Sequence, residues 1–147
     1  MDLLCSNLYK SDIHKVIDDV DCNFFKNSTV LVTGGLGLIC STIIDLLIEI
    51  KLRNNVELKI YIADRNKELF EKKYIKYDFV HYLEYDASLP INFSGKFDYI
   101  IHGAGIASPE KYILMPVETM LTTINGTINL LDYCKSNNVK RYIYFIK

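Results

Sequence analysis

The sequence has no marked surplus of charge of either sign. Its 17 basic and 18 acidic residues give a formal net charge of -1, and they are mixed along all 147 residues. The chain therefore has neither the basic stripe that indicates nucleic-acid binding nor the block of like charge that is typical of a disordered tail. With 50% hydrophobic and 24% charged residues, it has the composition of one globular domain without a nucleic-acid partner.

Long apolar runs are missing as well. The N-terminus has an acidic residue at position 2 and no apolar segment of the kind found in signal peptides. The longest apolar stretch, residues 36–50, contains Asp45 and Glu49, so it is too short and too charged to span a bilayer. We expect no leader peptide and no contact with a membrane.

Closely spaced cysteine pairs are also absent. The four cysteines are Cys5, Cys22, Cys40 and Cys134, and no two of them form a CxxC pair. This scatter predicts free thiols in a reducing cytoplasm rather than a disulfide framework or a zinc site. We therefore expect a cytoplasmic protein without a bound metal.

After residue 27, short β-branched segments alternate with helical patterns. The expected strands cover residues 28–33, 57–63, 80–85, 99–102 and 141–146. The expected helices between them cover residues 38–50, 66–74 and 116–135. One face of the first of these helices is formed by Leu38, Ile39, Ile43, Leu46, Leu47 and Ile50. One side of the last carries Met120, Ile124, Ile128, Leu131 and Cys134.

This alternation predicts βαβ units and hence an α/β fold of the Rossmann type. Right-handed crossovers that reverse direction after the third strand give a doubly wound parallel sheet with strand order 3-2-1-4-5. Residues 27–147 are expected to form this domain, which would be cut short after strand five. Residues 1–26 would be a helical extension, with a helix over residues 7–20 that starts at Ser11 or Asp12 and packs on the outside.

The most informative residues form the turn from the first strand into the first helix, with the sequence TGGLGLIC at positions 33–40. Glycines allow a tight turn and let backbone N–H groups approach a pyrophosphate, and the helix N-terminus adds partial positive charge. The flanking strand and helix favour this interpretation over a simple turn. The predicted dinucleotide contacts in this turn are Gly34, Gly35, Gly37, Leu38 and Ile39. Cys40 stands where such turns normally have glycine or alanine, so we expect weaker packing there.

An acidic residue, Asp64, ends the second strand. An acid at this point can accept hydrogen bonds from the ribose hydroxyls of adenosine, which predicts NAD as the cofactor. The alternatives are a solvated loop residue or the N-cap of the next helix. Arg65 can pair with a 2′-phosphate, so NADP stays open and Arg65 counts as a candidate cofactor contact.

Through this turn and four later motifs, the chain resembles the extended short-chain dehydrogenase/reductases. Among these, it is most similar to the NAD-dependent nucleotide-sugar epimerases and dehydratases. The turn is similar to the family's TGxxGxxG, residues 85–87 (YDA) to its acidic step after strand three, and residues 98–105 (DYIIHGAG) to its DxVIHxAA. Residues 116–131 are similar to the helix pattern P…ET…N..GT.NLL, and residues 138–144 to gVKRfVY at the entry to strand five. The similarity runs from about residue 27 to the end.

The resemblance implies a role for six further residues around the cofactor, which are Asp86, Ala87, Gly103, Ala104, Gly105 and Asn125. Asp86 would meet the adenine amine, and Asn125 would support the backbone of the active site. His102 is expected to be a core histidine rather than a catalyst. The substrate of the complete enzyme would be a UDP-, dTDP-, GDP- or CDP-sugar, processed by transient hydride transfer to NAD.

The family's catalytic pair is missing from the sequence. It consists of Tyr-x-x-x-Lys with a Ser or Thr after strand five, and its tyrosine acts as a general base while hydride passes to NAD. None of the 11 tyrosines is followed by lysine four residues later, and the expected Ser/Thr pair after Ile146 is replaced by Lys147. We therefore expect no catalytic residue here, and a chain that is a fragment or a natural truncation and is inactive alone.

Two other functions are compatible with parts of this pattern. A non-catalytic dinucleotide-binding module, which senses its cofactor or pairs with a partner chain, would also lack the catalytic pair. A methyltransferase has a similar glycine turn and acid, but residues 102–105 and 125–131 argue against it. In the family fold a sixth strand and a further helix cover strand five, so without them the strand at residues 141–146 would be an open edge with large side chains on both faces. We therefore expect self-association through residues 141–147 or disorder of that end.

Overall fold

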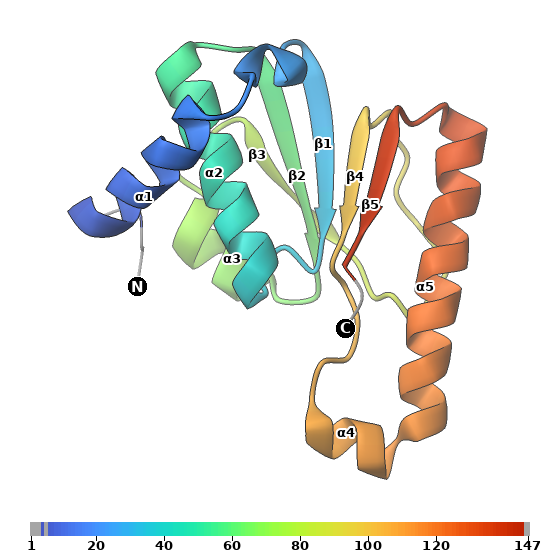
Figure 1. Ribbon diagram of the computed structural model, residues 1–147. Coiled ribbons are helices and arrows are strands. Elements are labelled where there is room, and N and C mark those ends of the chain that lie inside the picture. The colour runs from blue at the N-terminus through green and yellow to red at the C-terminus, as the bar shows by residue number, and fades with distance from the viewer. Residues whose placement is uncertain (1–3, 5, 146–147) are drawn as a thin grey trace.

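The computed structural model describes residue 4 and residues 6–145, and its centre is a five-stranded parallel sheet (Figure 1). The strands are β1 (Ser28–Thr33), β2 (Leu58–Asp64), β3 (Val80–Glu84), β4 (Tyr99–His102) and β5 (Arg141–Tyr144). Their order is β3-β2-β1-β4-β5, and the four neighbouring pairs are parallel. The predicted α/β class and strand order 3-2-1-4-5 are therefore confirmed.

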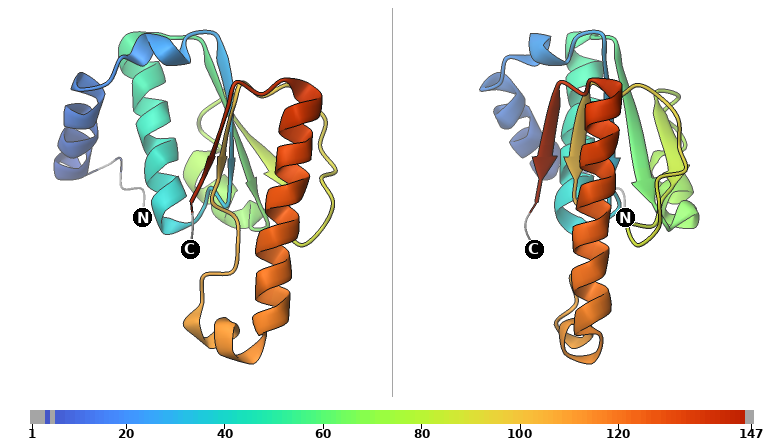
Figure 2. Two further views of the ribbon diagram at one scale, coloured as in Figure 1. Left: turned by 45° about the vertical axis from the view of Figure 1, so that its right-hand side comes forward. Right: turned by 90° about the vertical axis from the view of Figure 1, so that its right-hand side faces the viewer.

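Helices cover both faces of the sheet. On one side lie α1 (Asn7–Asp18), α2 (Leu38–Asn54) and α3 (Lys67–Tyr74), and on the other lies α5 (Pro116–Asn137), as Figures 1 and 2 show. A 3-10 helix, η2 (Cys22–Phe25), leads into β1, and the short α4 (Pro109–Leu114) precedes α5. The sequence pattern predicts neither η2 nor α4, because elements this short show no complete hydrophobic period.

The apolar side chains of β1 alternate between two cores. Val30 and Val32 belong to the core under α2 and α3. Leu31 belongs to the core under α5, together with Ile100 of β4 and Leu130 of α5. The central strand is thus buried on both faces, as its continuous apolar run predicts.

The buried face of α2 differs from the predicted one. Leu38 is 87% exposed and Ile39 is 61% exposed, whereas Ile44, Leu47 and Ile48 are buried. The first turn of α2 lies at the carboxyl edge of the sheet, where the described chain leaves Leu38 and Ile39 exposed. The prediction was wrong at these two positions because periodicity alone does not show where a helix extends past the sheet.

The outer side of α2 is covered by α1 through charged and polar contacts. Glu49 of α2 is buried, and its carboxylate lies 3.3 Å from the Lys10 ammonium and 2.8 Å from Nε2 of His14. Asp45, also buried, accepts a hydrogen bond of 2.9 Å from the Tyr9 hydroxyl. The two acids that interrupt the apolar stretch of α2 therefore hold α1 in place.

The other boundaries differ from the predicted ones by a few residues. α1 begins at Asn7 with Ser6 as its N-cap residue, so the predicted start at Ser11 or Asp12 is wrong. β2 is shifted by one residue and ends on Asp64. β5 ends at Tyr144, and the predicted last residue of that strand, Ile146, lies outside the described residues.

α5 covers the sheet with small and polar residues as well as leucine. Its buried residues are Thr119, Gly126 and Leu130. On the side named in the sequence pattern, Met120, Ile124, Ile128 and Leu131 are exposed. Four of the five residues of this apolar period therefore lie on the exposed surface, and the fifth, Cys134, is half-buried against the core.

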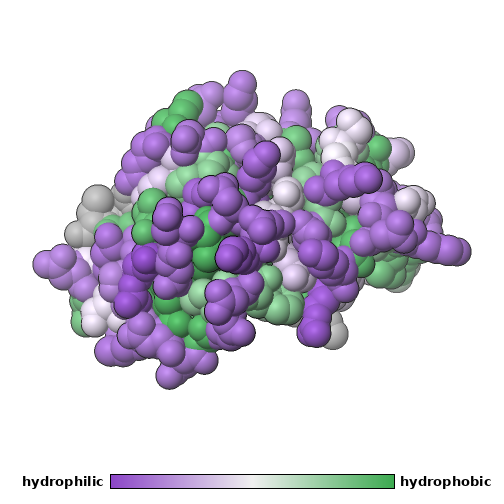
Figure 3. Space-filling model, turned by 90° about the horizontal axis from the view of Figure 1, so that it is seen from above, coloured by the Kyte–Doolittle hydropathy of each residue, from purple (hydrophilic) through white to green (hydrophobic). Residues whose placement is uncertain are grey.

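The end of the molecule at which the strands begin is mostly hydrophilic. Figure 3 looks onto this end, and its apolar residues form small separate spots between polar ones. The strands run away from this end (Figure 1), so their carboxyl ends and the glycine turn lie at the opposite end of the molecule. Ligand sites of open parallel sheets lie at that carboxyl edge.

Candidate functional site

The glycine turn after β1 packs against the end of β4. Gly34 has a φ of +64°, and a Cβ atom placed on it would lie 2.6 Å from the carbonyl oxygen of Gly103. Only glycine fits both this backbone conformation and this close approach. Two of the predicted contact segments, residues 34–39 and residues 103–105, are therefore neighbours at the carboxyl edge of the sheet.

The N-terminus of α2 is open at the same place. Gly37 is its N-cap residue, and among the described residues no side chain caps the helix. Leu38 and Ile39, which provide backbone N–H groups of the first turn, are both largely exposed. Uncapped N–H groups at a helix N-terminus, together with the helix dipole, favour binding of an anion such as a pyrophosphate.

Asp64 is tied to both sides of the turn that follows β2. One of its carboxylate oxygens accepts a hydrogen bond of 3.2 Å from the Leu36 N–H in the glycine turn. The other accepts from the N–H groups of Arg65 (2.8 Å) and Asn66 (3.2 Å). The N-cap of α3 is Asn66, whose side chain accepts from the Leu69 N–H at 2.9 Å, so Asp64 is not the cap of that helix.

Arg65 and Asp86 come together beside Asp64, at the ends of β2 and β3. Their closest side-chain nitrogen and oxygen are 3.9 Å apart. Asp86 accepts hydrogen bonds from the hydroxyl (2.7 Å) and the N–H (2.9 Å) of Ser88, and these bonds, with a smaller effect of Arg65, hold the pKa of its carboxyl below the usual value. Asp86 is therefore ionised at neutral pH and can accept from a donor such as an amine.

A buried hydrogen-bond network joins β1 to the segment after β4. Nδ1 of His102 lies 2.6 Å from the Thr33 hydroxyl oxygen, which also accepts from the Ala104 N–H at 3.3 Å. His102 is fully buried, which agrees with its predicted place in the core. Through Thr33, the position of Ala104 is fixed relative to the glycine turn.

Cys40 fits into the space left by Gly103. The thiol is 4% exposed, and a Cβ atom placed on Gly103 would overlap with its sulfur. Cys40, which is larger than the usual glycine or alanine at the end of the glycine turn, is therefore accommodated because the residue facing it is Gly103. The weaker packing expected at Cys40 is avoided because of this pairing.

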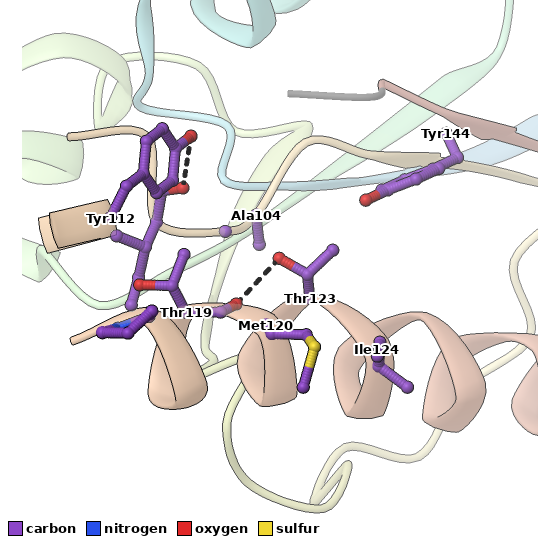
Figure 4. Close-up of a pocket in the computed structure, with 10 residues that line it drawn as sticks. Ala104, Tyr112, Thr119, Met120, Thr123, Ile124 and Tyr144 are labelled. Carbon is purple, nitrogen blue, oxygen red and sulfur yellow. Dashed lines mark hydrogen bonds between the residues drawn. The ribbon is translucent and has the colours of Figure 1, made fainter. Parts of the chain in front are cut away.

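A cavity of about 300 Å³ lies between the segment after β4, the two last helices and β5 (Figure 4). Ala104 and Gly105 line it together with the hydroxyl-bearing Tyr112, Thr119, Thr123 and Tyr144. The hydroxyls of Tyr112, Thr119 and Thr123 donate to backbone carbonyls. Within residue 4 and residues 6–145, none of the ten lining residues is a lysine, a histidine or an acid.

Asn125 and Thr123 differ in their relation to this cavity. Asn125 is exposed on α5 and is not among the lining residues, whereas Thr123 is. In the pattern N..GT the asparagine comes three residues before the glycine, and with Gly126 as that glycine the position is held by Thr123. Counting the spacing strictly from Gly126 identifies Thr123, the functional candidate that the sequence reasoning missed.

Ala87 lies where the segment after β3 crosses α5. It is buried, and a Cβ atom placed on Gly126 would lie 3.1 Å from its Cβ. This contact fixes the segment that carries Asp86 against α5.

Other kinds of site were searched for in the described part of the chain. Residue 4 and residues 6–145 contain no cluster of three or more His, Cys, Asp or Glu side chains that could hold a metal ion. Over the same residues, no helix combines the length and the apolar character needed to cross a membrane. Cys22, Cys40 and Cys134 are free thiols, and Cys5 lies outside the described residues.

Comparisons with known proteins agree with these features. The bifunctional protein GAL10 of Candida maltosa is 32% identical over 78% of this chain and 78% of its own length. UDP-glucuronic acid decarboxylase 6 of Arabidopsis thaliana is 34% identical over 76% of this chain, but the match spans only 32% of that protein. The structure of a UDP-N-acetylglucosamine 4-epimerase from Methanobrevibacter ruminantium M1, in complex with UDP-N-acetylmuramic acid, superposes with a TM-score of 0.64 and 27% identity. That superposition covers 80% of this chain and 37% of the epimerase.

A family model matches most of the domain. It describes the NAD dependent epimerase/dehydratase family and covers residues 30–146, which include the glycine turn, the strands β2 to β5 and all but the first two residues of β1. The predicted resemblance to nucleotide-sugar epimerases and dehydratases is confirmed, and the family's NAD dependence agrees with the predicted cofactor. The chain belongs to the NAD dependent epimerase/dehydratase family.

Proposed function

We propose that residues 27–147 are the NAD-binding portion of an enzyme that changes the sugar of a nucleotide sugar by transient hydride transfer, with residues 1–26 as an extension. One observation carries this proposal. The glycine turn, Asp64 and the segment after β4 meet at the carboxyl edge of the sheet, beside the uncapped N-terminus of α2. The relatives named above for UDP-glucuronic acid and UDP-N-acetylglucosamine favour a UDP-sugar as the substrate class.

The residues at this edge fit the parts of a dinucleotide. The N–H groups of Leu38 and Ile39 would donate to the pyrophosphate, since they lie in the exposed first turn of α2. Asp64 would accept from the ribose, and Asp86 would accept from the adenine amine. Bound NAD would supply the hydride acceptor. Residues 103–105 would border its reacting end, next to the cavity of Figure 4.

The same geometry favours NAD over NADP. Asp64 presents a carboxylate at the end of β2, and a carboxylate repels a 2′-phosphate. Arg65, which could attract that phosphate, is placed 3.9 Å from the ionised Asp86 instead. We therefore propose that NAD binds more tightly than NADP.

We propose further that this chain alone does not turn over a sugar nucleotide. No Tyr-x-x-x-Lys pair occurs in it, and no described residue that lines the cavity beside residues 103–105 is charged. The matched part makes up about a third of the Arabidopsis decarboxylase and of the archaeal epimerase. The substrate lobe and the general base would therefore have to come from outside these residues.

A second candidate function rests on that same cavity. A chain that binds NAD without a proton-transfer group would act as a non-catalytic cofactor-binding module, which either senses the cofactor or pairs with a partner chain. The two functions predict the same cofactor binding, but they differ in whether a complementing chain restores sugar-nucleotide turnover. Adding the separately expressed C-terminal part of a related epimerase would restore turnover only if this chain is half of an enzyme.

Titration calorimetry with both cofactors tests the proposed function. We expect NAD to bind, Gly37→Val to abolish binding because a branched side chain would occupy the space of the pyrophosphate, and Asp64→Ala to weaken binding by about 1–3 kcal/mol. Lys59→Ala, on the exposed surface of β2, is the matched control and should leave affinity unchanged. Equal affinity before and after Asp64→Ala would reassign Asp64 to holding the glycine turn through Leu36.

A further inference from the structure

Two tyrosine hydroxyls are enclosed in the core beneath α5. Tyr85, which directly follows β3, is 4% exposed, and Tyr142 of β5 packs against the same cluster of buried residues. Both hydroxyl oxygens are buried, and among the described residues neither has a hydrogen-bond partner at normal geometry. Leaving a buried hydroxyl without a partner costs the desolvation of that group, so such cases are rare in folded proteins. Two of them in one core indicate a ligand.

The two hydroxyls lie close together, and a third hydroxyl is near them. Burial raises the pKa of Tyr142, and the nearby hydroxyl of Thr127 lowers it. Smaller electrostatic effects that raise this pKa come from Cys134, Tyr144 and Tyr85. Because such effects weaken with distance, the polar groups of Thr127 and Tyr85 must lie near the Tyr142 hydroxyl. These three side chains form a hydroxyl cluster that joins α5, β5 and the segment after β3.

The hydroxyl cluster contains two donors and one acceptor. Burial, with a smaller effect of Asp86, raises the pKa of Tyr85 to about 12, and burial also raises the pKa of Tyr142. Both phenols therefore keep their protons at neutral pH, and each has a proton to donate. The Thr127 hydroxyl already donates to the Thr123 carbonyl oxygen at 2.8 Å, so its own oxygen is left with lone pairs that can accept.

This set of groups matches one class of ligand. A water molecule can accept from both tyrosines and donate to Thr127, which gives the three hydrogen bonds typical of buried water. An anion is disfavoured because the Asp86 carboxylate lies close enough to Tyr85 to raise its pKa, and a cation is disfavoured because two of the three groups are donors. We propose that Tyr85, Tyr142 and Thr127 bind a buried water molecule that links the segment after β3 to β5 and α5.

The cavity of Figure 4 gives water a way to this site. Thr123 of α5 and Tyr144 of the facing strand line the cavity. Thr127 lies one helical turn after Thr123, and Tyr142 lies two residues before Tyr144, so each is on the same side of its element as its cavity-lining neighbour. The ring of His102, whose centre is 6.1 Å from that of Tyr142 and 5.2 Å from that of Tyr144, contacts both. The hydroxyl cluster therefore continues the cavity inward between α5 and β5.

Urea unfolding of the chain of residues 1–147 at pH 7 tests the site, because bound water and unpaired hydroxyls predict effects of opposite sign. With the water, Tyr85→Phe and Tyr142→Phe should each raise the equilibrium constant of unfolding by about fivefold, because each removes one hydrogen bond. The double variant should raise it by less than the product of the two single effects, since the first substitution already weakens the site.

Without a ligand, each phenylalanine would instead remove a buried unpaired donor and stabilise the fold. Stabilisation or no effect in either single variant overturns the proposal. Tyr61→Phe is the matched control, since Tyr61 packs against the same cluster of buried residues but is half-exposed. It should change the equilibrium constant of unfolding by less than about twofold.

Nuclear Overhauser spectra between water and the isotope-labelled chain observe the ligand directly. We expect the hydroxyl protons of Tyr85 and Tyr142 to exchange slowly with solvent and to show cross-peaks to a long-lived water molecule. A cross-peak from the Tyr142 hydroxyl to Thr127 alone, with none from Tyr85 to water, would indicate a direct bond between those two side chains and contradict the water site. Neither measurement needs a cofactor, so the result does not depend on the proposed function.

Discussion

α2 and α5 cover opposite faces of one sheet, but they are buried to very different extents. α2 is enclosed between the sheet and α1, so that even Asp45 and Glu49 are buried along with Ile44, Leu47 and Ile48. α5 buries Thr119, Gly126 and Leu130 and leaves the apolar side chains on its outer face, such as Ile128 and Leu131, exposed. The half of the molecule that carries the glycine turn is thus closed within the chain, whereas the described chain leaves the outer face of α5 uncovered.

The largest expected effect is on stability, and it compares the burial of α2 with that of α5. Ile48→Ala in the fully buried part of α2 should lower the free energy of unfolding by about 2–5 kcal/mol, because it leaves a cavity. Ile128→Ala should cost less than about 1 kcal/mol, because that side chain is half-exposed. Urea unfolding of both variants makes the comparison. Equal losses would mean that α5 is as enclosed as α2.

A smaller effect is expected where the glycine turn meets β4. Gly103→Ala should destabilise the fold by about 1–3 kcal/mol, because the new methyl group would overlap with the Cys40 sulfur. In a chain that already carries Cys40→Ala, the same substitution should cost much less, since the overlap is relieved. Thermal unfolding of the two single variants and the double variant checks this. Additive losses would show that Cys40 and Gly103 are not coupled.

The smallest expected effect concerns Asp98, which joins the two halves of the sheet. Burial opposes ionisation of this carboxyl, but hydrogen bonds from the Lys140 ammonium (2.9 Å) and the Thr29 N–H (2.8 Å) outweigh burial and hold the pKa below its usual value. The unfolded chain therefore binds this proton at a higher pH than the folded chain does. The stabilisation is complete above the unfolded pKa and is lost as the pH falls through the folded pKa.

In a series from pH 7 downward, Asp98→Asn should therefore cost about 1 kcal/mol at pH 7 and progressively less as the pH falls through the folded pKa. Urea unfolding of the variant and the wild type over this pH range measures the difference. A constant difference between them at all pH values would mean that the charge of Asp98 contributes nothing.

The strand order and the glycine turn could be predicted because both leave local signals in the sequence. Apolar runs such as residues 28–33 alternate with helical periods, and right-handed crossovers then allow few arrangements. The burial of Asp45 and Glu49 could not be predicted in this way. From the sequence alone, acids are expected at the surface. In the structure they are buried because Lys10, His14 and Tyr9 of α1 bind them.

The fit of Cys40 against Gly103 escaped prediction for a similar reason. The two residues lie 63 positions apart, and nothing local to either one shows that they touch. The apolar period of α5 was visible in the sequence, but a period does not tell whether its residues face the sheet or the solvent. Contacts between residues far apart in the sequence thus decide the burial of Asp45 and Glu49 and the fit of Cys40.

The central claim is that NAD binds at the carboxyl edge of the sheet, at the uncapped N-terminus of α2. The most direct measurement is the change in backbone amide NMR shifts when NAD is added to the isotope-labelled chain. We predict large changes at residues 34–40, at Asp64 and at residues 103–105, with none along the outer side of α5. No change up to millimolar NAD, or changes confined to α1 or α5, would contradict the account.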